Sequence, residues 1–190
     1  MKTNNEVPAY NGKPLYYLET KRPPELTEYQ TLRLTIPFHP LKLSWRIGSK
    51  SKGNATVLAY IDARDVQDRL DDAVGNGNWK NEYFFHGSRV LCRLSIKIGS
   101  EWISKEDGAG DTHIEGEKGG LSDAFKRAAV HWGINRDAYA LPTTWAKLTD
   151  KGYLPKDINA QMASKMPNWY LKKYKEIADR LKELTTNNED

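Results

Sequence analysis

Three consecutive strand-like segments of the chain are joined by turns of two residues. The segments are 79–86, 89–98 and 101–106, and the turns are Gly87–Ser88 and Gly99–Ser100. Segment 89–98 has apolar residues at every second position from Val90 to Ile98. Because successive side chains of a strand point to opposite faces, this alternation is typical of a strand that is buried on one face. Turns this short join antiparallel neighbours. The pattern therefore predicts an antiparallel meander.

A hairpin is predicted upstream of the meander. Residues 41–48 carry leucine, tryptophan or isoleucine at every second position, and 56–61 return as an apolar strand. A loop rich in Gly, Ser and Lys joins them. Capping signals or apolar residues at helical spacing predict helices at 27–34, 63–74 and 121–132 and after Pro167. We therefore expect an α+β fold in which a curved antiparallel sheet of about five strands packs on helices.

The chain has the length of one ordinary domain with tails, at 190 residues. Four of its nine prolines lie within 1–25, which predicts an extended arm there. Residues 26–148 hold the predicted strands and the central helix, and 149–190 form a helical extension with a frayed tail. The single cysteine and the lack of a signal-peptide or membrane-spanning stretch favour a cytoplasmic protein with no membrane partner.

Basic residues are placed in rows along two of the predicted strands. The chain is mildly basic overall, with a net charge of +4, which permits a polyanionic partner. Side chains two positions apart on a strand share a face and lie about 7 Å from each other, so such a row can bind consecutive phosphates without reading base sequence. Ion pairs across the sheet, for example to Glu82, are the alternative. The rows consist of Lys42 and Arg46 on the first strand and Arg89, Arg93 and Lys97 on the fourth.

The stretch SDAFKRAAVHWG, residues 122–133, predicts a helix with two cations beside its apolar stripe. Lys126 and Arg127 both lie off that stripe. Asp123 stands four residues before Arg127, so an intrahelical ion pair is expected for that arginine. One carboxylate offsets one charge, and Lys126 is left without a full partner. The helix is therefore expected to keep a net positive outer face.

No catalytic or cofactor motif is recognisable, so we expect a non-enzymatic protein without metal or cofactor. Two other functions stay open. Glu106, Asp107 and Asp111 would suit Mg²⁺ in a metal-dependent nuclease, although a solvated acidic loop is the simpler interpretation. The basic surface would equally suit a scaffold that binds a protein partner.

Three segments resemble the Rad52-type single-strand annealing proteins, and in particular their bacterial DNA damage response protein A branch. Residues 122–142, SDAFKRAAVHWGINRDAYALP, resemble the signature helix of this family. Residues 60–79, YIDARDVQDRLDDAVGNGNW, resemble its strand-to-helix segment. The strand with Trp45 and Arg46 is a weaker third match. The likeness spans about 41–145 with its segments in family order.

The resemblance implies a ββα-type annealing domain that assembles into a homo-oligomeric ring or filament. Such proteins hold single-stranded DNA by its phosphates and promote the annealing of complementary strands without ATP, in homologous recombination and double-strand-break repair. The implied partners are single-stranded DNA, further copies of the chain and a single-strand-binding protein. The implied location is the nucleoid.

Site residues follow from the resemblance position by position. At Val130 the eukaryotic members carry a further arginine, so DNA affinity or geometry is expected to differ here. Two outer cations would hold a second strand. The implied DNA-binding residues are Arg46, Tyr60, Lys126 and Arg127 in the groove, with Lys97 as an outer contact. The cation row on the same strand adds Arg93 as a second outer contact.

Overall fold

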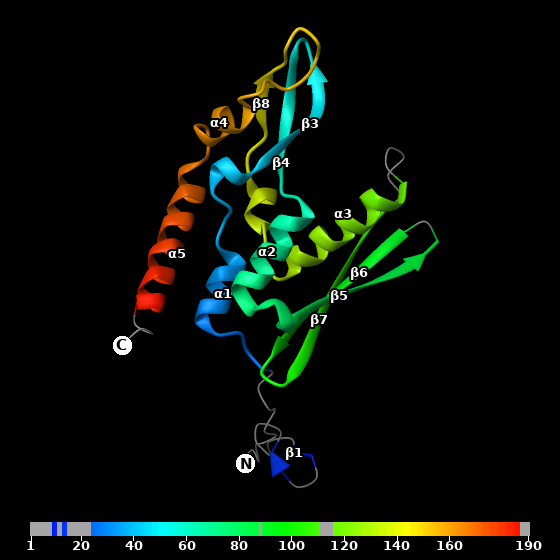
Figure 1. Cartoon of the computed structure of the whole chain (residues 1–190), viewed down its shortest axis with the longest axis vertical. Coiled ribbons are helices and arrows are strands. Elements are labelled where there is room, and N and C mark those ends of the chain that lie inside the picture. Colours follow the sequence, from blue (N-terminus) through cyan, green and yellow to red (C-terminus); the bar gives the residue numbers. More distant parts are fainter. Residues whose placement is uncertain (1–8, 11–12, 15–23, 88, 111–115, 187–190) are drawn as a thin grey trace, which may run out of the picture.

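A computed structural model describes residues 9–10, 13–14, 24–87, 89–110 and 116–186. Within these residues the chain is an α+β structure with two three-stranded antiparallel sheets and a layer of helices (Figure 1). A further pair of two-residue strands, β1 (Ala9–Tyr10) and β2 (Lys13–Pro14), lies within the predicted N-terminal arm. The rest of that arm up to residue 23 lies outside the described residues.

The first sheet has the order β3–β4–β8. The predicted hairpin is confirmed as β3 (Ser44–Ser51) and β4 (Asn54–Tyr60), and β8 (Thr144–Lys147) adds an unpredicted third strand. The strand expected from residue 41 starts later, because Pro40 opens a 3-10 turn, η2 (Pro40–Lys42). Lys42 therefore does not share a strand face with Arg46, and that part of the predicted cation row is wrong.

The second sheet is the predicted meander, in the order β5–β6–β7. Its strands are β5 (Trp79–His86), β6 (Arg89–Ile98) and β7 (Glu101–Ala109). The five predicted strands are thus present, but a single five-stranded sheet is not. Both edges of β4 are occupied, by β3 and β8, so β5 has no edge of that strand to pair with.

Five α-helices connect or cover the sheets in the described part of the chain. A capping box between Thr27 and Gln30 starts α1, and Asp62 caps α2, as predicted. The last helix includes Thr185 and Thr186, so this part of the predicted frayed tail is helical, and 187–190 lie outside the described residues. The helices are α1 (Glu28–Thr35), α2 (Ala63–Val74), α3 (Gly116–His131), α4 (Ile158–Ala163) and α5 (Asn168–Thr186). Short 3-10 turns are η3 (Asn76–Asn78) and η4 (Arg136–Ala140).

The main core lies between α3 and the inner face of the second sheet (Figure 1). The apolar stripe predicted for α3 is buried there, with Phe125 and Trp132 as its largest members. Every second residue of β6 faces it, including Cys92, which is fully buried as expected. Burial of these apolar surfaces is the main driving force for folding. It also fixes which side of α3 is left for solvent.

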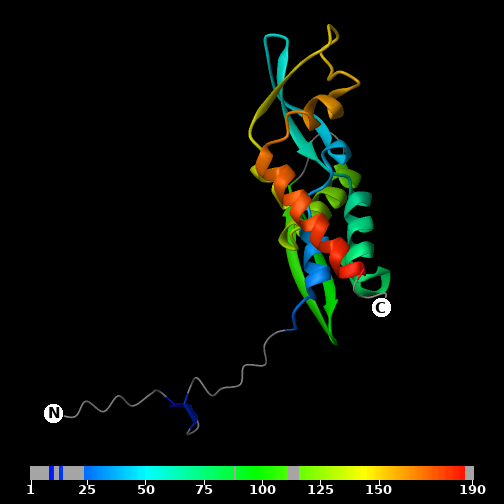
Figure 2. The same cartoon turned by 90° about the vertical axis from the view of Figure 1, so that its left-hand side faces the viewer.

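The helices α1, α2 and α5 extend this core, because their buried residues Leu34, Leu70 and Tyr170 belong to the same cluster. Seen from the side, α5 runs diagonally across α1 (Figure 2). The buried Tyr170 hydroxyl donates a 2.8 Å hydrogen bond to the Phe38 carbonyl, and Arg180 forms an ion pair with Glu28 of α1. No helix in the described ranges is both long and apolar enough to cross a membrane.

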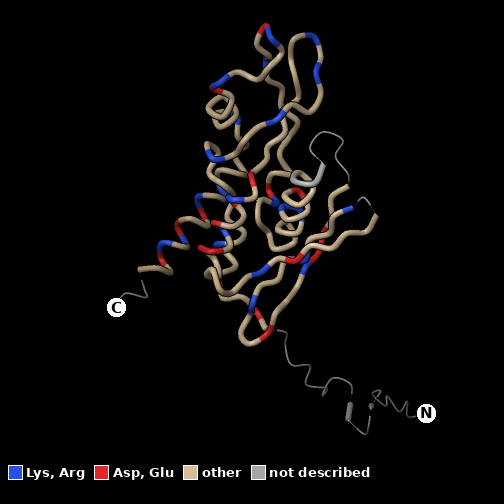
Figure 3. The backbone as a smooth tube through the Cα atoms, turned by 45° about the vertical axis from the view of Figure 1, so that its right-hand side comes forward, with Lys and Arg blue, Asp and Glu red and all other residues tan. Residues whose placement is uncertain are grey.

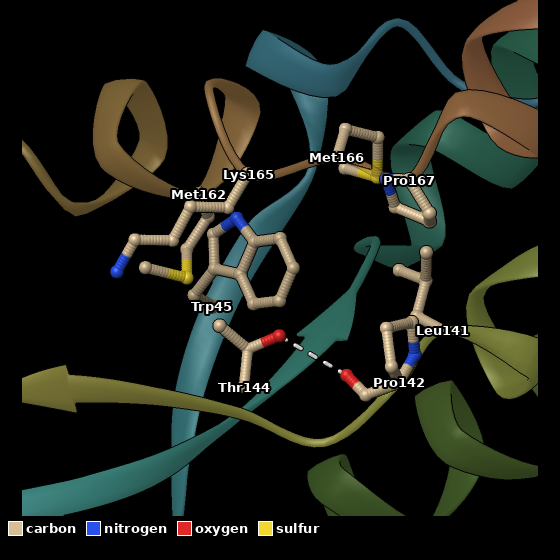
Figure 4. A pocket seen from close by; sticks show the side chains of 8 residues that line it. All are labelled: Trp45, Leu141, Pro142, Thr144, Met162, Lys165, Met166 and Pro167. Atoms are coloured by element: carbon tan, nitrogen blue, oxygen red, sulfur yellow. Dashed lines mark hydrogen bonds between the residues drawn. The ribbon is translucent and has the colours of Figure 1, made fainter.

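The first sheet is covered on one face by α4. Val57 and Ala146 of the sheet pack there against Ile158 and Met162. Trp45 of β3 lies between Met162 and Met166 on the same side (Figure 4). The opposite face of this sheet carries several exposed large side chains.

Candidate nucleic-acid interface

The helix α3 holds Lys126 and Arg127 on the side away from the core. The residues that flank the two cations on this helix are buried, so helical geometry directs the cations outward. These buried residues are Ala124, Phe125, Ala128 and Ala129. The side chain of Lys126 is 27% exposed and that of Arg127 is 44% exposed. The core face of the helix thus determines where its cations point.

Each of the two cations has an acidic partner. Lys126 Nζ lies 3.8 Å from Asp123 Oδ1, three residues earlier on the same helix. Arg127 instead donates from Nε and Nη2 to Asp107 Oδ1 of β7, at 3.3 and 3.2 Å. The predicted Asp123–Arg127 pair is therefore wrong, because β7 runs on beside α3 and brings Asp107 to the arginine. The expected net positive face is offset by two carboxylates rather than one.

Asp107 is the centre of a small polar cluster. His131 Nε2 lies 3.3 Å from its Oδ2, and the Gly108 backbone N–H donates to its Oδ1 at 2.7 Å. Partial burial alone raises the pKa of Asp107, but the Gly108 and Arg127 interactions outweigh it and lower the pKa below its ordinary value. The carboxylate is therefore ionised at neutral pH.

Arg46 and Tyr60 lie together on the exposed face of the first sheet. Arg46 is opposite Leu58 in the register of β3 and β4, and Tyr60 is opposite Ser44. Residues two apart on a strand share a face, so Tyr60 is the diagonal neighbour of Arg46. Among the described residues Arg46 has no ion pair, which leaves its charge available to a ligand.

Arg93 and Lys97 project from the second sheet on the face opposite α3. Arg93 forms an ion pair with Glu106 and lies 4.7 Å from the centre of the Phe84 ring. The cross-strand pair considered as the alternative is thus present for Arg93. Lys97 is exposed and has no ion pair within the described ranges.

The predicted site residues therefore fall into three pairs on three surfaces. Lys126 and Arg127 share α3, and Arg46 and Tyr60 share a face of the first sheet. The third pair, on the outer face of the second sheet, is separated from α3 by the sheet itself. The structure brings together the members of each pair and gives no direct contact between the pairs.

The acidic residues weighed as a metal site do not converge. Glu106 and Asp107 are neighbours on β7 and point to opposite faces of the sheet, where each binds an arginine. Asp111 lies outside the described residues. In the described part of the chain no group of His, Cys, Asp and Glu has the arrangement of a metal centre.

Several cations and aromatics near these pairs were missed by sequence reasoning. Arg136 donates to the carbonyl oxygens of Val130 and His131 at 2.8 and 3.0 Å, so its guanidinium group lies at the end of α3. Trp145 and Lys147 of β8 join the face that holds Arg46 and Tyr60. A four-residue strand has too little alternation to be recognised, and only its pairing with β4 reveals the face.

These features define an α+β domain that presents cations from a helix and from neighbouring strands. The model for the Rad52/22 family of double-strand break repair proteins matches residues 27–156. This match covers more than half of the chain, and the protein therefore belongs to that family. The resemblance seen in the sequence is thus confirmed.

Two curated relatives are both named single-stranded DNA-binding protein DdrA. The one from Deinococcus deserti is 39% identical over 124 residues, covering 62% of this chain and 60% of the relative. The one from Deinococcus radiodurans is 33% identical over 141 residues, covering 72% of this chain and 65% of the relative. The matched region thus spans less than two thirds of either relative.

Proposed function

We propose that the protein binds single-stranded DNA through its phosphate backbone and promotes the annealing of complementary strands in recombinational repair. The observation that carries the proposal is the pair Lys126–Arg127, held outward on α3 in a member of the Rad52/22 family. The names of the DdrA relatives support the choice of ligand. Annealing needs a grip on the backbone that leaves base edges free, and Lys and Arg provide it.

The acidic partners of these cations are compatible with DNA binding. Surface ion pairs contribute roughly 0–1 kcal/mol, and those of Lys126 and Arg127 are partly exposed. A phosphate therefore replaces Asp123 or Asp107 at small cost. Binding then becomes an exchange of carboxylate for phosphate around two fixed cations. Arg46, with an exposed and unpaired charge in the described structure, supplies a third contact without that exchange.

The remaining assignments extend this proposal. Tyr60 packs against a sugar or base beside Arg46, and Lys97, with Arg93, forms an outer contact for a second strand. Residues 26–148 act as the annealing domain, and 149–190 act as a helical extension. The reaction is ATP-independent, because base pairing itself drives it. The protein works as a homo-oligomeric ring or filament and contacts a single-strand-binding protein; its mass in solution, with and without DNA, tests the first part.

The direct test is an annealing assay with complementary oligonucleotides. Lys126→Ala/Arg127→Ala should slow annealing at least tenfold relative to wild type, because two phosphate contacts are lost. Lys172→Ala/Lys182→Ala is the matched control, since both lysines lie on α5 and pair with acids of their own helix. It removes the same charge and should anneal like wild type.

Equal annealing rates for the two double variants would contradict the assignment. The same assay separates the alternatives. A nuclease would consume the labelled strands when Mg²⁺ is added, whereas an annealing protein leaves the total label intact. A scaffold for a protein partner would leave the annealing rate at that of the oligonucleotides alone.

A further inference from the structure

The exposed face of the first sheet is larger than the Arg46–Tyr60 pair. Thr56 is opposite Trp145 in the register of β4 and β8, and Asn54 is opposite Lys147. Because Thr56 and Tyr60 are four residues apart on β4, they share a face. Trp145 and Lys147 therefore lie on the face that holds Arg46 and Tyr60. We call Arg46, Leu58, Tyr60, Trp145 and Lys147 the Trp145 face.

Large side chains on this face are unusually exposed. Trp145 is 49% exposed, Leu58 is 42% exposed and Tyr60 is 36% exposed. The neighbouring Ala146 points the other way and is buried under α4. An exposed tryptophan beside a second aromatic offers a flat π-surface on which bases stack regardless of their sequence.

Cations lie at both ends of the Trp145 face. Arg46 is next to Tyr60, and Lys147 is at the opposite end, beside the tip of the β3–β4 hairpin. Figure 3 shows further Lys and Arg positions along this hairpin. The tip also borders a hollow of about 450 Å³. Its lining includes three lysines and one acidic residue, namely Lys50, Lys52, Lys147 and Asp150. The tip is therefore complementary to a polyanion.

Lys50 at the tip lies on the opposite face of the sheet from Trp145, because it is paired with Ala55, which is buried on the side of Ala146. Lys50 Nζ donates a 2.9 Å hydrogen bond to the carbonyl of Gly152, which ties the hairpin to the chain after β8. Gly152, whose carbonyl accepts this hydrogen bond, has a positive φ of 77°, a conformation that suits glycine. The distance along β4 from Tyr60 to the tip is about 20 Å, enough for several nucleotides of an extended strand.

We propose that the Trp145 face is a second part of the single-stranded DNA site, where bases stack on Trp145 and phosphates bind Arg46 and Lys147. This inference rests on the proposed function and extends it beyond α3 and the Arg46–Tyr60 pair. The occupant is single-stranded DNA rather than a protein, because an aromatic surface bordered by cations at both ends matches a chain that carries bases and phosphates. Leu58 then contributes apolar contact to a sugar or a base.

The test compares two ligands of equal length, an oligothymidylate and an abasic deoxyribose-phosphate chain, by fluorescence anisotropy at fixed salt. Trp145→Ala should weaken oligothymidylate binding roughly 5- to 160-fold, the range expected for loss of one stacked base. Its affinity for the abasic chain should stay that of wild type. Trp145→Phe keeps an aromatic ring and should restore most of the lost affinity.

Trp169→Ala is the matched control, because Trp169 is 40% exposed on α5. It should bind both ligands like wild type, and the unfolding midpoint of each variant is measured to show that it is folded under the conditions of the binding assay. If Trp145→Ala binds oligothymidylate as tightly as wild type, the inference is overturned while the proposed function stands. If it instead changes only the mass of the protein in solution, the face is an interface between copies, and the inference is also overturned. If wild type binds neither ligand, the proposed function itself fails.

Discussion

Arg127 shows how a single side chain connects folding and binding. Its guanidinium group binds Asp107, 20 positions away in the sequence, and the same carboxylate contacts His131. The pKa of Asp107 is lowered by these neighbours, so the carboxylate competes with phosphate throughout the neutral range. Asp107 thus limits the affinity of Arg127 for DNA.

Asp107→Asn is therefore expected to tighten binding of single-stranded DNA roughly two- to fivefold at low salt, the factor expected for releasing one surface ion pair. The gain should shrink as salt rises, because the competing interaction is screened. Asp179→Asn on α5 removes the same charge from the Lys182 pair and should change affinity little. Weaker binding by Asp107→Asn would mean that the carboxylate positions Arg127 rather than competing for it.

The residue scale also shows what sequence can predict about a site. Lys126 and Arg127 were identifiable because the apolar stripe of their helix is local. The acidic partners of these cations were not identifiable from the sequence, because the Arg127–Asp107 ion pair depends on how far β7 extends. Trp145 and Lys147 were missed for the same reason, since their face is defined only by pairing with β4.

At the scale of elements, the end of α3 depends on close packing against α1. Gly133 has φ +94°, and a Cβ there would lie 2.6 Å from Thr35 Cγ2 of α1. Gly133→Ala should therefore destabilise the protein by about 1–3 kcal/mol, from backbone strain and the clash together. Urea unfolding measures the change.

Two further variants identify the cause. Thr35→Ser removes the clashing methyl group, so the double variant should regain part of the stability but not the share lost to strain. Gly77→Ala should be within about 0.5 kcal/mol of wild type, because nothing lies within 4 Å of its added Cβ. Equal effects of the two glycine substitutions would contradict the packing described here.

The reactivity of Cys92 reports how well the central strand β6 is protected from solvent. Cys92 is the only cysteine of the chain and is fully buried, and burial raises the pKa of its thiol to about 11. Alkylation requires the thiolate, so at pH 8 the native protein should react at least about 100-fold more slowly than the chain in denaturant. Comparable rates would show that α3 does not cover this strand in solution.

Elements were predicted well where the signal was local, and their assembly was not. Caps at Thr27 and Asp62 and the alternation of β3 and β6 identify these helices and strands directly. The division into two sheets depends on whether β4 pairs with β8 or with the meander. The pairing of β4 with β8 joins residues nearly 90 positions apart, so a local periodic pattern in the sequence does not predict it.

At the scale of the whole molecule, the two sheets have different relations to the helices. The second sheet buries one face under α3 and leaves Arg93 and Lys97 on the other. The first sheet buries one face under α4 and leaves the Trp145 face exposed. The candidate DNA contacts are therefore spread over a helix and two sheet faces, and one strand of DNA need not contact all of them.

The central claim is that Lys126 and Arg127 bind phosphates, and the salt dependence of DNA binding tests it most directly. Each phosphate contact on a single strand contributes roughly 0.7 to the slope of log affinity against log salt. Relative to wild type, Lys126→Ala/Arg127→Ala should reduce the magnitude of this slope by about 1.4, whereas Lys172→Ala/Lys182→Ala should leave it unchanged. A slope for the first variant equal to that of wild type would contradict the account.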